Sequence, residues 1–479
     1  MKRILLGLFS LVFLTLTACG TQELPRNTGT YGATDGLELF LSEHQPVKEP
    51  WTEEDFETLH SYMQPETFEQ TFTVAQIQEL MEEKETVERL TAEQAAEDVH
   101  LTFDLLAYGY GGYHYFGGNE VFLPIRDTIL DRLSHMETIE TTELRNLLWD
   151  NLSPVLIDSH FNIHTSLSVP YDTEKKFLQQ TYYVPDFYFD DPTGIDSQYV
   201  KHTIGPEGAI TYCLATVCTS PEALPNSLII EGKEHTLKWV VAESVSRTSE
   251  EAEQIYSETT VAAKQLPVIR SYALRGDQTK LEAFTATGTA YRKAPQLVLD
   301  LRGNRGGQDI YSDVWLNNFS DINVKAKNLF VHKRSNLYYA TYEFDDTFSG
   351  DWEFGTKSDG IPWKRDNLVF VLIDNNTASS GETFARLLSF GHRVILVGCN
   401  TMGCSTFANN IDYYLPNSGI NLYFGHSLCF FDCIENREGV GLFPDLWVNP
   451  ADSLDAVVRL CKYYGLIENK SNFKDLFIK

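Results

Sequence analysis

Positive charge is scarce in this sequence of 479 residues. Lysine and arginine together number 38, against 67 aspartate and glutamate residues, and the formal net charge is −29 at pH 7. Nucleic acids and anionic membrane surfaces attract proteins through basic patches. The composition therefore argues against both as partners, and we expect the acidity to serve solubility.

Long hydrophobic runs are also nearly absent, and the one that occurs stands at the N-terminus. Two basic residues precede an apolar stretch from Ile4 to Leu16, which is too short for a permanent membrane span and is typical of a signal peptide. The Leu-Thr-Ala-Cys sequence that ends at Cys19 resembles a bacterial lipobox. We therefore expect a lipoprotein signal peptide over residues 1–18, a lipid on Cys19, a polar tether over residues 19–50 and a lipid-anchored, extracytoplasmic place in the bacterial cell envelope.

Cysteine is sparse as well, with eight residues in the chain. Without Cys19 seven remain, so at least one thiol stays free even in an oxidising compartment. The close pairs Cys399/Cys404 and Cys429/Cys433 raise zinc as an alternative, but the two-residue spacing of structural zinc knuckles is missing. We expect no metal and no cofactor.

The length predicts two or three units, because one core seldom serves so long a chain. Helical spacing of apolar residues predicts a helical N-terminal domain over residues 51–155. Aromatic-rich strand patterns predict a mixed β-rich region over 156–294, with a polar linker or surface helix from Glu250 to Leu266. Strands and helices alternate over 295–479, which is typical of an α/β core. The expected fold class is α/β, or α+β for the whole chain.

The stretch from Leu368 to Gly391 predicts a buried strand, a polar turn and an amphipathic helix. Ser379 falls at the junction, where free N–H groups and the helix dipole stabilise negative charge. A serine nucleophile fits this position. Considered alone, the stretch favours a serine that only caps the helix, because capping serines are far commoner than nucleophiles.

A second informative stretch, QLVLDLRGNRGG, runs from Gln296 to Gly307 and leads from a predicted strand into a glycine-rich turn. Glycines let the backbone approach a ligand closely with its N–H groups exposed. A phosphate-binding loop is a poor match, because the Walker spacing and its lysine are missing.

The motifs DLRGNRGG and TASSGE, in this order, resemble those of the tail-specific, C-terminal-processing serine peptidase family. The DSH triplet upstream and EGVGLFPD downstream follow the order of the family as well. The resemblance covers the chain from about Thr91 onward and is strongest from Pro295 to Val448. It implies a core of spiralled β-β-α units, like that of the crotonase and Clp peptidase folds, and a nucleophile at Ser379, three residues before Glu382.

No lysine occurs from Asp366 through Cys461. Family members with a Ser/Lys dyad carry the lysine where this chain has the turn around Cys404. Without an ammonium group that can lose its proton such a dyad cannot operate, so another base is required. Cys404 is no substitute, because an acidic protein offers little to lower the pKa of a thiol.

The branch of the family exemplified by the tricorn core protease uses histidine as its base, and the resemblance extends to those residues. Ser159 and His160 in DSH match the orienting serine and the base, and Glu438 in EGVGLFPD matches the glutamate. The resemblance implies that His160 takes the hydroxyl proton of Ser379. Glu438, acting through Ser159, would hold the tautomer of the imidazole.

The same resemblance implies that the backbone N–H groups of Gly306 and Ser380 bind the oxyanion. Rival residues stand close by, namely His164 for the base and Glu435 for the glutamate. Many relatives insert a PDZ domain before the core. The segment from Ile204 to Gly208 is the nearest candidate for the carboxylate-binding loop of such a domain, and it matches poorly. The sequence therefore does not predict recognition of C-terminal carboxylates.

These observations predict a serine endopeptidase of peptides or unfolded proteins. One rival is a catalytically inactive, peptide-binding lipoprotein on the same fold, which the missing lysine favours. Another is a hydrolase of non-peptide esters or amides that uses the same site.

Overall fold

The computed structural model describes residues 31–44, 52–61, 72–167, 175–249, 251, 253–322, 329–333, 335, 337, 352–356, 363–431 and 437–468. Its helices are α1 (Gly36–Glu43), α2 (Glu53–Ser61), α3 (Val74–Met81), α4 (Ala92–Gly109), α5 (Asn119–Ser134), α6 (Thr141–Leu152), α7 (Gln278–Tyr291), α8 (Asp309–Ser320), α10 (Ser380–Ser389) and α11 (Ser453–Tyr463), with 3-10 turns at Pro221–Ala223 and Pro450–Asp452. Its strands are β1 (Arg89–Thr91), β2 (Thr138–Glu140), β3 (Asn162–His164), β4 (Gln180–Phe189), β5 (Val200–Ile204), β6 (Ile210–Cys218), β7 (Ser227–Ile230), β8 (Lys233–Thr236), β9 (Val240–Val241), β10 (Tyr256–Val261), β11 (Leu266–Ser271), β12 (Gln296–Asp300), β13 (Leu329–Lys333), β14 (Trp352–Thr356), β15 (Leu368–Ile373), β16 (Val394–Gly398), β17 (Phe407–Tyr414), β18 (Asn421–Phe430) and β19 (Leu446–Trp447).

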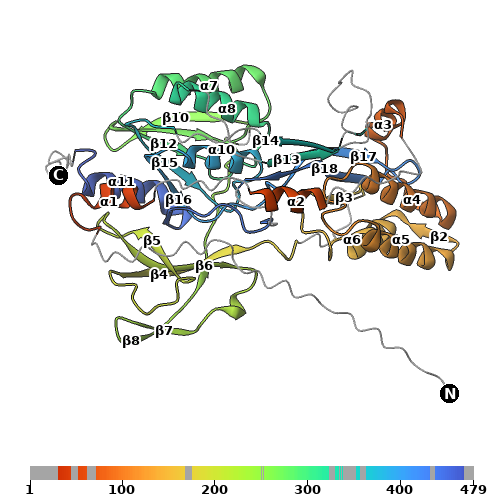
Figure 1. Ribbon diagram of the computed structural model, residues 1–479, viewed down its shortest axis with the longest axis horizontal. Helices are drawn as coiled ribbons and strands as arrows, with labels where there is room; N and C mark the ends of the chain where they lie inside the picture. Colours follow the sequence, from red (N-terminus) through yellow and green to blue (C-terminus); the bar gives the residue numbers. More distant parts are fainter. Residues whose placement is uncertain are drawn as a thin grey trace, which may run out of the picture.

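A six-stranded sheet in the order β10-β11-β12-β15-β16-β19 forms the centre of the core, and only β10 runs antiparallel to its neighbour. All six residues of β15 are buried, because helices cover both faces of the sheet. Every second residue of β15, beginning with Val369, packs with α7, α8 and α10, and the alternate set, beginning with Leu368, packs with α1 and α11 (Figure 1). The predicted α/β core is therefore confirmed.

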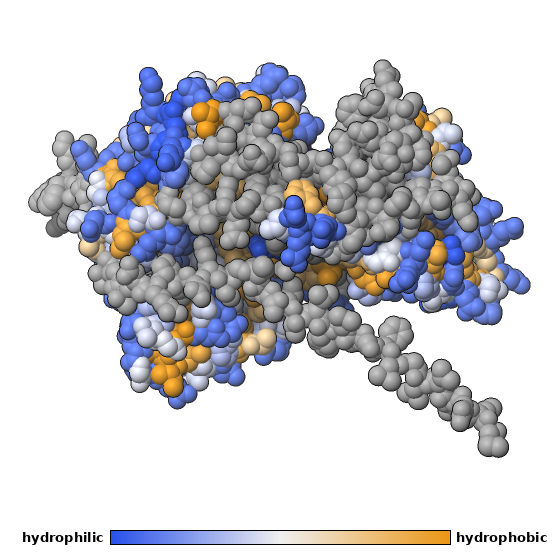
Figure 2. All heavy atoms as spheres, viewed as in Figure 1, coloured by the Kyte–Doolittle hydropathy of each residue, from blue (hydrophilic) through white to orange (hydrophobic). Residues whose placement is uncertain are grey.

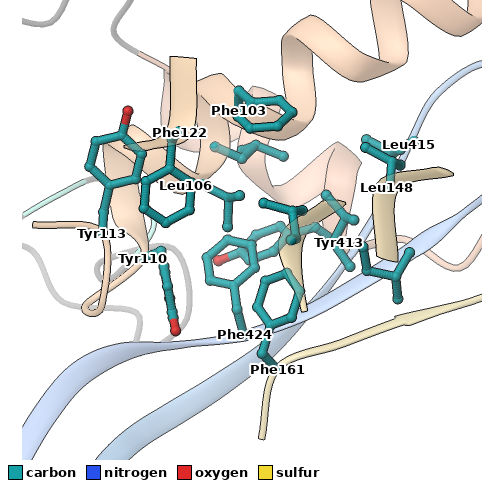
Figure 3. Packing of buried hydrophobic residues seen from close by; sticks show 14 of the residues in the cluster. Phe103, Leu106, Tyr110, Tyr113, Phe122, Leu148, Phe161, Tyr413, Leu415 and Phe424 are labelled. Atoms are coloured by element: carbon teal, nitrogen blue, oxygen red, sulfur yellow. The ribbon is translucent and has the colours of Figure 1, made fainter. Parts of the chain in front are cut away.

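A second sheet, in the order β14-β13-β18-β17 with β3 beside β18, joins this core to the helical N-terminal part. Helices α4, α5 and α6 pack against it around a cluster of buried aromatic and aliphatic side chains. In Figure 3, Phe103 and Leu106 of α4 face Tyr413 of β17 and Phe424 of β18. The helical region predicted over 51–155 therefore shares its core with strands from the C-terminal half.

The third part of the fold is a small sheet in the order β5-β6-β4-β9, with the hairpin β7–β8 at its end (Figure 1). This hairpin lies in the region over 156–294 that the sequence predicts to be rich in strands. Over the helices the face shown in Figure 2 is mainly hydrophilic, and apolar side chains gather near the hairpin, where Ile229 is 67 % exposed.

Two segments differ from the sequence-based expectation. Tyr256–Val261 forms the edge strand β10, where we predicted a polar linker or surface helix. An edge strand has a partner on one side only, and the side chains of β10 are half-buried or exposed, so its sequence lacks the apolar pattern of a buried strand. Within the predicted tether, α1 docks on the core through Leu37, Phe40 and Leu41, which recur at helical spacing. The signal peptide and Cys19 lie outside the described residues.

Across the part of the chain that the structure describes, no helix combines the length and apolar character needed to cross a membrane.

Candidate active site

Ser379 lies at the junction where the central strand β15 gives way to helix α10. The strand is paired on both sides, with β12 and β16, and the helix begins at Ser380. The backbone of Ser379 has φ 52° and ψ −126°, a conformation that residues with a side chain rarely adopt. Ser379 is half-buried, whereas its neighbours Ala378 and Ser380 are buried. This is the sharp strand-to-helix turn that exposes the nucleophile in many hydrolases.

The turn after β15 is fastened to the glycine-rich loop after β12. The buried carboxylate of Asp374 accepts the N–H of Gly303 at 2.9 Å and the N–H of Val245 at 2.8 Å. Its burial raises its pKa. The N–H of Ala378 donates to the carbonyl oxygen of Asn304 at 2.9 Å. The two stretches singled out in the sequence are therefore held side by side.

Gly306 packs directly against the serine. Its φ is 89°, and a Cβ atom at this position would lie 3.0 Å from Cβ of Ser379 and 2.7 Å from the backbone nitrogen of Ser380. Only glycine permits this conformation together with so close an approach. The N–H of Gly306 donates to Oδ1 of Asn304 at 2.9 Å. Gly306 and Ser380, the two residues predicted to bind the oxyanion, are thus neighbours in space, and the N–H of Gly306 is engaged with Asn304.

Glu382 gives a structural reason for the Ser-x-x-Glu spacing. Its carboxylate is buried in the first turn of α10 and accepts four hydrogen bonds. Oε2 accepts the N–H of Ser379 at 3.2 Å and the N–H of Cys404 at 2.7 Å. Oε1 accepts the N–H of Gly403 at 3.0 Å and the hydroxyl of Thr401. Glu382 therefore ties the loop after β16 to the backbone of the serine.

Cys404 occupies the position that the Ser/Lys members of the family give to lysine. It stands 25 residues after Ser379, and its Sγ lies 3.1 Å from the backbone nitrogen of that serine. Burial raises the pKa of the Cys404 thiol well above its ordinary value, and the charges of Glu382 and Glu438 add to this effect. The thiol is therefore protonated at neutral pH and cannot take a proton from the serine.

Ser159 and Glu438 meet although 279 residues separate them. Oε2 of Glu438 accepts the N–H of Ser159 at 2.8 Å, and Oε1 accepts the N–H of Thr406 at 2.7 Å. The hydroxyl of Ser159 donates to the carbonyl oxygen of Gly403 at 2.8 Å. Burial, with the nearby charge of Asp158, raises the pKa of Glu438 to about 8. The DSH triplet is thus docked on the loop that Glu382 ties to the nucleophile.

His160 follows in the same triplet. Its backbone N–H and that of Phe161 donate to Oδ1 of Asp158 at 2.7 and 3.0 Å. The ring nitrogen Nδ1 is buried, and among the described residues it has no hydrogen-bond partner. Burial lowers the pKa of the imidazole, and the charge of Lys175 acts in the same direction, against that of Asp158. The ring is therefore neutral near pH 7, as a general base must be.

The rival histidine lies elsewhere. His164 ends β3, pairs with Asn421 of β18 and is exposed, so it lies outside the loop that Glu438 holds. Glu435, the rival glutamate, lies outside the described residues.

Lys175 supports the backbone of the candidate site, and the sequence analysis did not single it out. Its Nζ donates to the carbonyl oxygens of Asp158, Ser159 and Phe161 at 3.0, 2.5 and 2.8 Å. Burial lowers its pKa, and Asp158 opposes the shift. All three protons of the ammonium group are used, so Lys175 fixes the backbone around His160. The polar segment that carries it has no pattern that would have revealed this role.

The candidate carboxylate-binding loop from Ile204 to Gly208 is the turn between β5 and β6. Its amides are used internally, since the N–H of Gly205 donates to Ala209 and the N–H of Gly208 donates to Gly205. A Cβ at Gly208 would lie 2.4 Å from the carbonyl oxygen of Arg459 on α11. The turn therefore packs closely against α11, and the amides of Gly205 and Gly208 are engaged within it.

Cys213, Cys218, Cys399, Cys404 and Cys461 are free thiols. Within the described ranges, no group of histidine, cysteine, aspartate and glutamate residues is arranged to hold a metal ion. Cys433, one of the cysteines considered for zinc, lies outside them.

A strained serine at a helix start, a glycine loop against it and a neutral histidine in an adjoining loop are groups that the site of a serine hydrolase on an α/β core requires. Residues 268–446 match the model of peptidase family S41. This match supports a relationship of this part of the chain to the serine peptidases of that family.

Solved structures similar to the chain include mature CPAF, with 12 % identity over 78 % of this chain and 98 % of that one and a TM-score of 0.43. The photosystem II D1 C-terminal processing protease has 15 % identity over 77 % and 97 %, with a TM-score of 0.37. A lipoprotein from Streptococcus agalactiae has 14 % identity over 77 % and 95 %, with a TM-score of 0.36. No curated protein matches the sequence. The assignment rests on the family match.

Proposed function

We propose that this protein is a serine endopeptidase that cleaves peptides or unfolded proteins through an acyl-enzyme on Ser379. The observation that carries the proposal is the half-buried Ser379 at φ 52°, with Gly306 packed against its Cβ and Glu382 holding its backbone. Such strain persists only where the surroundings enforce it, and it is concentrated at active sites.

In this mechanism Oγ of Ser379 attacks the carbonyl carbon of the substrate while the ring of His160 takes the hydroxyl proton. The negative charge on the tetrahedral oxygen is stabilised by the N–H groups of Gly306 and Ser380. For Gly306 this requires its N–H to turn from Asn304 to the oxyanion. His160 then gives the proton to the leaving amine, and water, deprotonated by the same ring, hydrolyses the ester.

Protonation of His160 during this cycle calls for an acceptor at the buried Nδ1. The neighbouring Ser159 hydroxyl, now directed to Gly403, could accept from Nδ1 after a rotation about χ1. Glu438 keeps Ser159 in place through its backbone N–H. We assign Ser159 and Glu438 as positioning residues on this basis.

We further propose that Cys19 carries a lipid and that the peptidase acts on the outer side of a bacterial membrane. The support is the charged start, the short apolar run and the Leu-Thr-Ala-Cys sequence. Replacement Cys19→Ser should move the protein from the membrane fraction to the soluble fraction. An unchanged membrane fraction would contradict lipid anchoring through this residue.

A second candidate is a protein that binds peptides without cleaving them. It is favoured by the engagement of the Gly306 N–H with Asn304 and of the Ser159 hydroxyl with Gly403, both of which occupy groups that the mechanism needs.

Hydrolysis assays separate these candidates. The mature protein is incubated with casein and, separately, with small esters, and Ser379→Ala is assayed alongside it. The peptidase is expected to cleave casein, with the activity lost in the variant. Turnover of esters alone would point to a non-peptide hydrolase, and binding of peptides without any cleavage would point to the binding protein.

A further inference from the structure

A small cavity opens beside the glycine-rich loop of the candidate active site. Its volume is about 290 Å³, and its wall includes Gly303 and Gly306. Gly306 packs so closely on Ser379 that a Cβ atom added to it would lie 3.0 Å from Cβ of the serine. A group bound in this cavity therefore lies next to the residues around the scissile bond of a substrate.

Three arginines from separate segments also line the cavity. Arg247 comes from the loop after β9, Arg275 from the link between β11 and α7, and Arg305 from the glycine-rich loop itself. Arg247 donates to the carbonyl oxygen of Gly303 at 3.3 Å, and Arg305 donates to Asn376 at 3.4 Å. Within the described part of the chain, none of these three guanidinium groups has a carboxylate at ion-pair distance.

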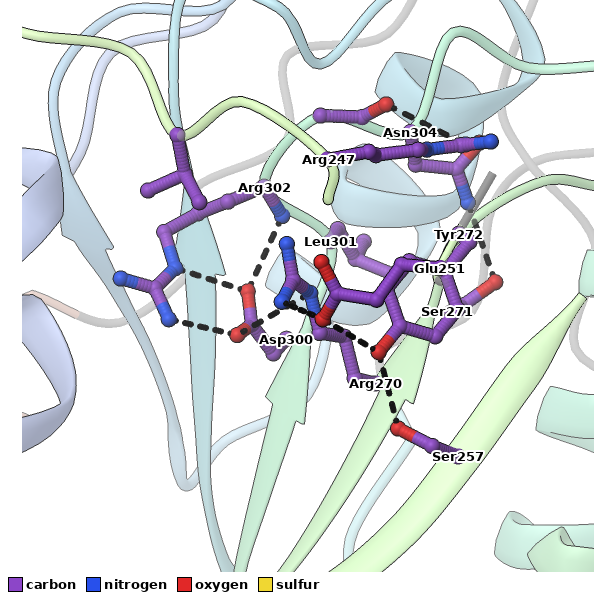
Figure 4. A network of polar contacts seen from close by, with 12 residues as sticks. Arg247, Glu251, Ser257, Arg270, Ser271, Tyr272, Asp300, Leu301, Arg302 and Asn304 are labelled. Atoms are coloured by element: carbon purple, nitrogen blue, oxygen red, sulfur yellow. Dashed lines mark hydrogen bonds and ion pairs between the residues drawn. The ribbon is translucent and has the colours of Figure 1, made fainter. Parts of the chain in front are cut away.

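Nearby arginines that do not line the cavity are neutralised, as Figure 4 shows. Arg270 pairs with Glu251 at 2.8 Å, and Arg302 forms a two-point contact with Asp300 at 2.8 and 2.6 Å. Among the residues that the structure describes, the lack of a carboxylate at ion-pair distance therefore distinguishes the three arginines of the cavity wall from these neighbours.

The three arginines repel one another. Burial lowers the pKa of Arg247, and the charges of Arg270, Arg275 and Arg305 lower it further. The planar ring of Tyr272 lies 5.6 Å from Cζ of Arg247 and offsets part of this repulsion. Three arginines without a paired carboxylate form a local positive patch that attracts anions, and this patch contrasts with the net charge of −29 of the chain.

We propose that this cavity is a specificity pocket for an acidic side chain, aspartate or glutamate, of a peptide bound across Ser379. Guanidinium groups match the geometry of a carboxylate and hold it by two parallel hydrogen bonds. A cavity of about 290 Å³ has room for a whole acidic side chain, not only for a carboxylate group. The proposal rests on the proposed function in that it assumes a peptide at this site.

The test measures binding, so that it does not depend on catalysis. Fluorescein-labelled peptides with amidated C-termini carry one glutamate at successive positions of an Ala/Gly backbone, and a matched set carries glutamine. Their dissociation constants for the Ser379→Ala protein are measured by fluorescence anisotropy. At one position, glutamate is expected to bind about tenfold more tightly than glutamine, the scale of charge-assisted hydrogen bonds that are partly shielded from water.

The difference should shrink to less than about twofold when Arg275→Gln and Arg305→Gln are combined in the Ser379→Ala background. Both arginines are exposed, so circular dichroism should show an unchanged fold. Arg132→Gln removes the same charge from an arginine on α5 that pairs with Glu143, and it should leave the preference intact.

A further variant, Arg275→Glu, should weaken the preference for glutamate at the same position more than Arg275→Gln does, because it adds a negative charge beside the two remaining arginines. The proposal is overturned if glutamate and glutamine bind alike at every position, if the preference survives in the double variant, or if only a free C-terminus strengthens binding. Failure of catalysis at Ser379 would leave these binding results unaffected, so the two hypotheses fail separately.

Discussion

Sγ of Cys404 lies 3.1 Å from the backbone nitrogen of Ser379, although 25 residues separate the two in the sequence. This thiol cannot serve as the base, because burial keeps it protonated. The base must therefore come from another segment. The loop around His160 is docked on the same turn through Ser159 and Gly403.

Cys404→Ala tests whether the Cys404 thiol takes part in catalysis or only fills space. If the thiol only fills space, kcat/KM should fall by less than about threefold, while removal of the buried sulfur lowers the free energy of unfolding by about 1–2 kcal/mol. Peptide hydrolysis and urea unfolding measure the two quantities. A loss of activity of more than about a hundredfold in a stably folded variant would give the thiol a chemical role.

The lowered pKa of His160 predicts how kcat/KM depends on pH. A general base works in its neutral form, and burial lowers the pKa of this imidazole below 6.5. We therefore expect kcat/KM to rise with pH through a pKa below 6.5 and then to level off. The profile should disappear with His160→Gln, which should also lower kcat/KM by about a thousandfold or more.

His164→Gln is the matched control for this experiment, since His164 lies four residues away and is exposed. It should keep both the rate and the pH profile. If His164→Gln removed the activity and His160→Gln did not, the assignment of the base would be wrong.

The raised pKa of Glu438 predicts how the free energy of unfolding depends on pH. Its pKa is raised from 4.5 to about 8 in the folded protein, so the folded state binds a proton more tightly than the unfolded state between these values. The free energy of unfolding should therefore decrease as pH rises from about 4.5 to about 8, by up to about 1.4 kcal/mol per pH unit from this group.

Glu438→Gln removes the titrating group, so its unfolding free energy should depend less on pH across this window than that of the wild type. Urea unfolding at several pH values measures the difference, with Glu143→Gln on the surface of α6 as control. Parallel pH curves for the wild type and Glu438→Gln would refute the raised pKa.

Much of the central core could be predicted because its signals are local. The apolar run from Leu368 to Ile373 is strand β15, and the periodic residues after Ser379 form α10. The edge strand β10 was missed because its own residues show no strand pattern. It is a strand because it pairs with β11.

The site was predictable only in part. The motifs indicated Ser379, Gly306 and Glu438 through the family resemblance, but not what holds them. The role of Lys175 depends on three backbone carbonyls that only the fold brings to its Nζ. The arginine-lined cavity likewise combines three segments that are distant in sequence, so no local sequence pattern predicts it.

Covalent labelling tests the central claim most directly. The mature protein is treated with a fluorophosphonate, digested and mapped by mass spectrometry, together with His160→Gln and His164→Gln. We predict phosphonylation of Ser379 in the wild type and in His164→Gln, and strongly slowed labelling in His160→Gln. A folded wild-type protein in which Ser379 stays unmodified, or is modified as fast without His160, would contradict the account.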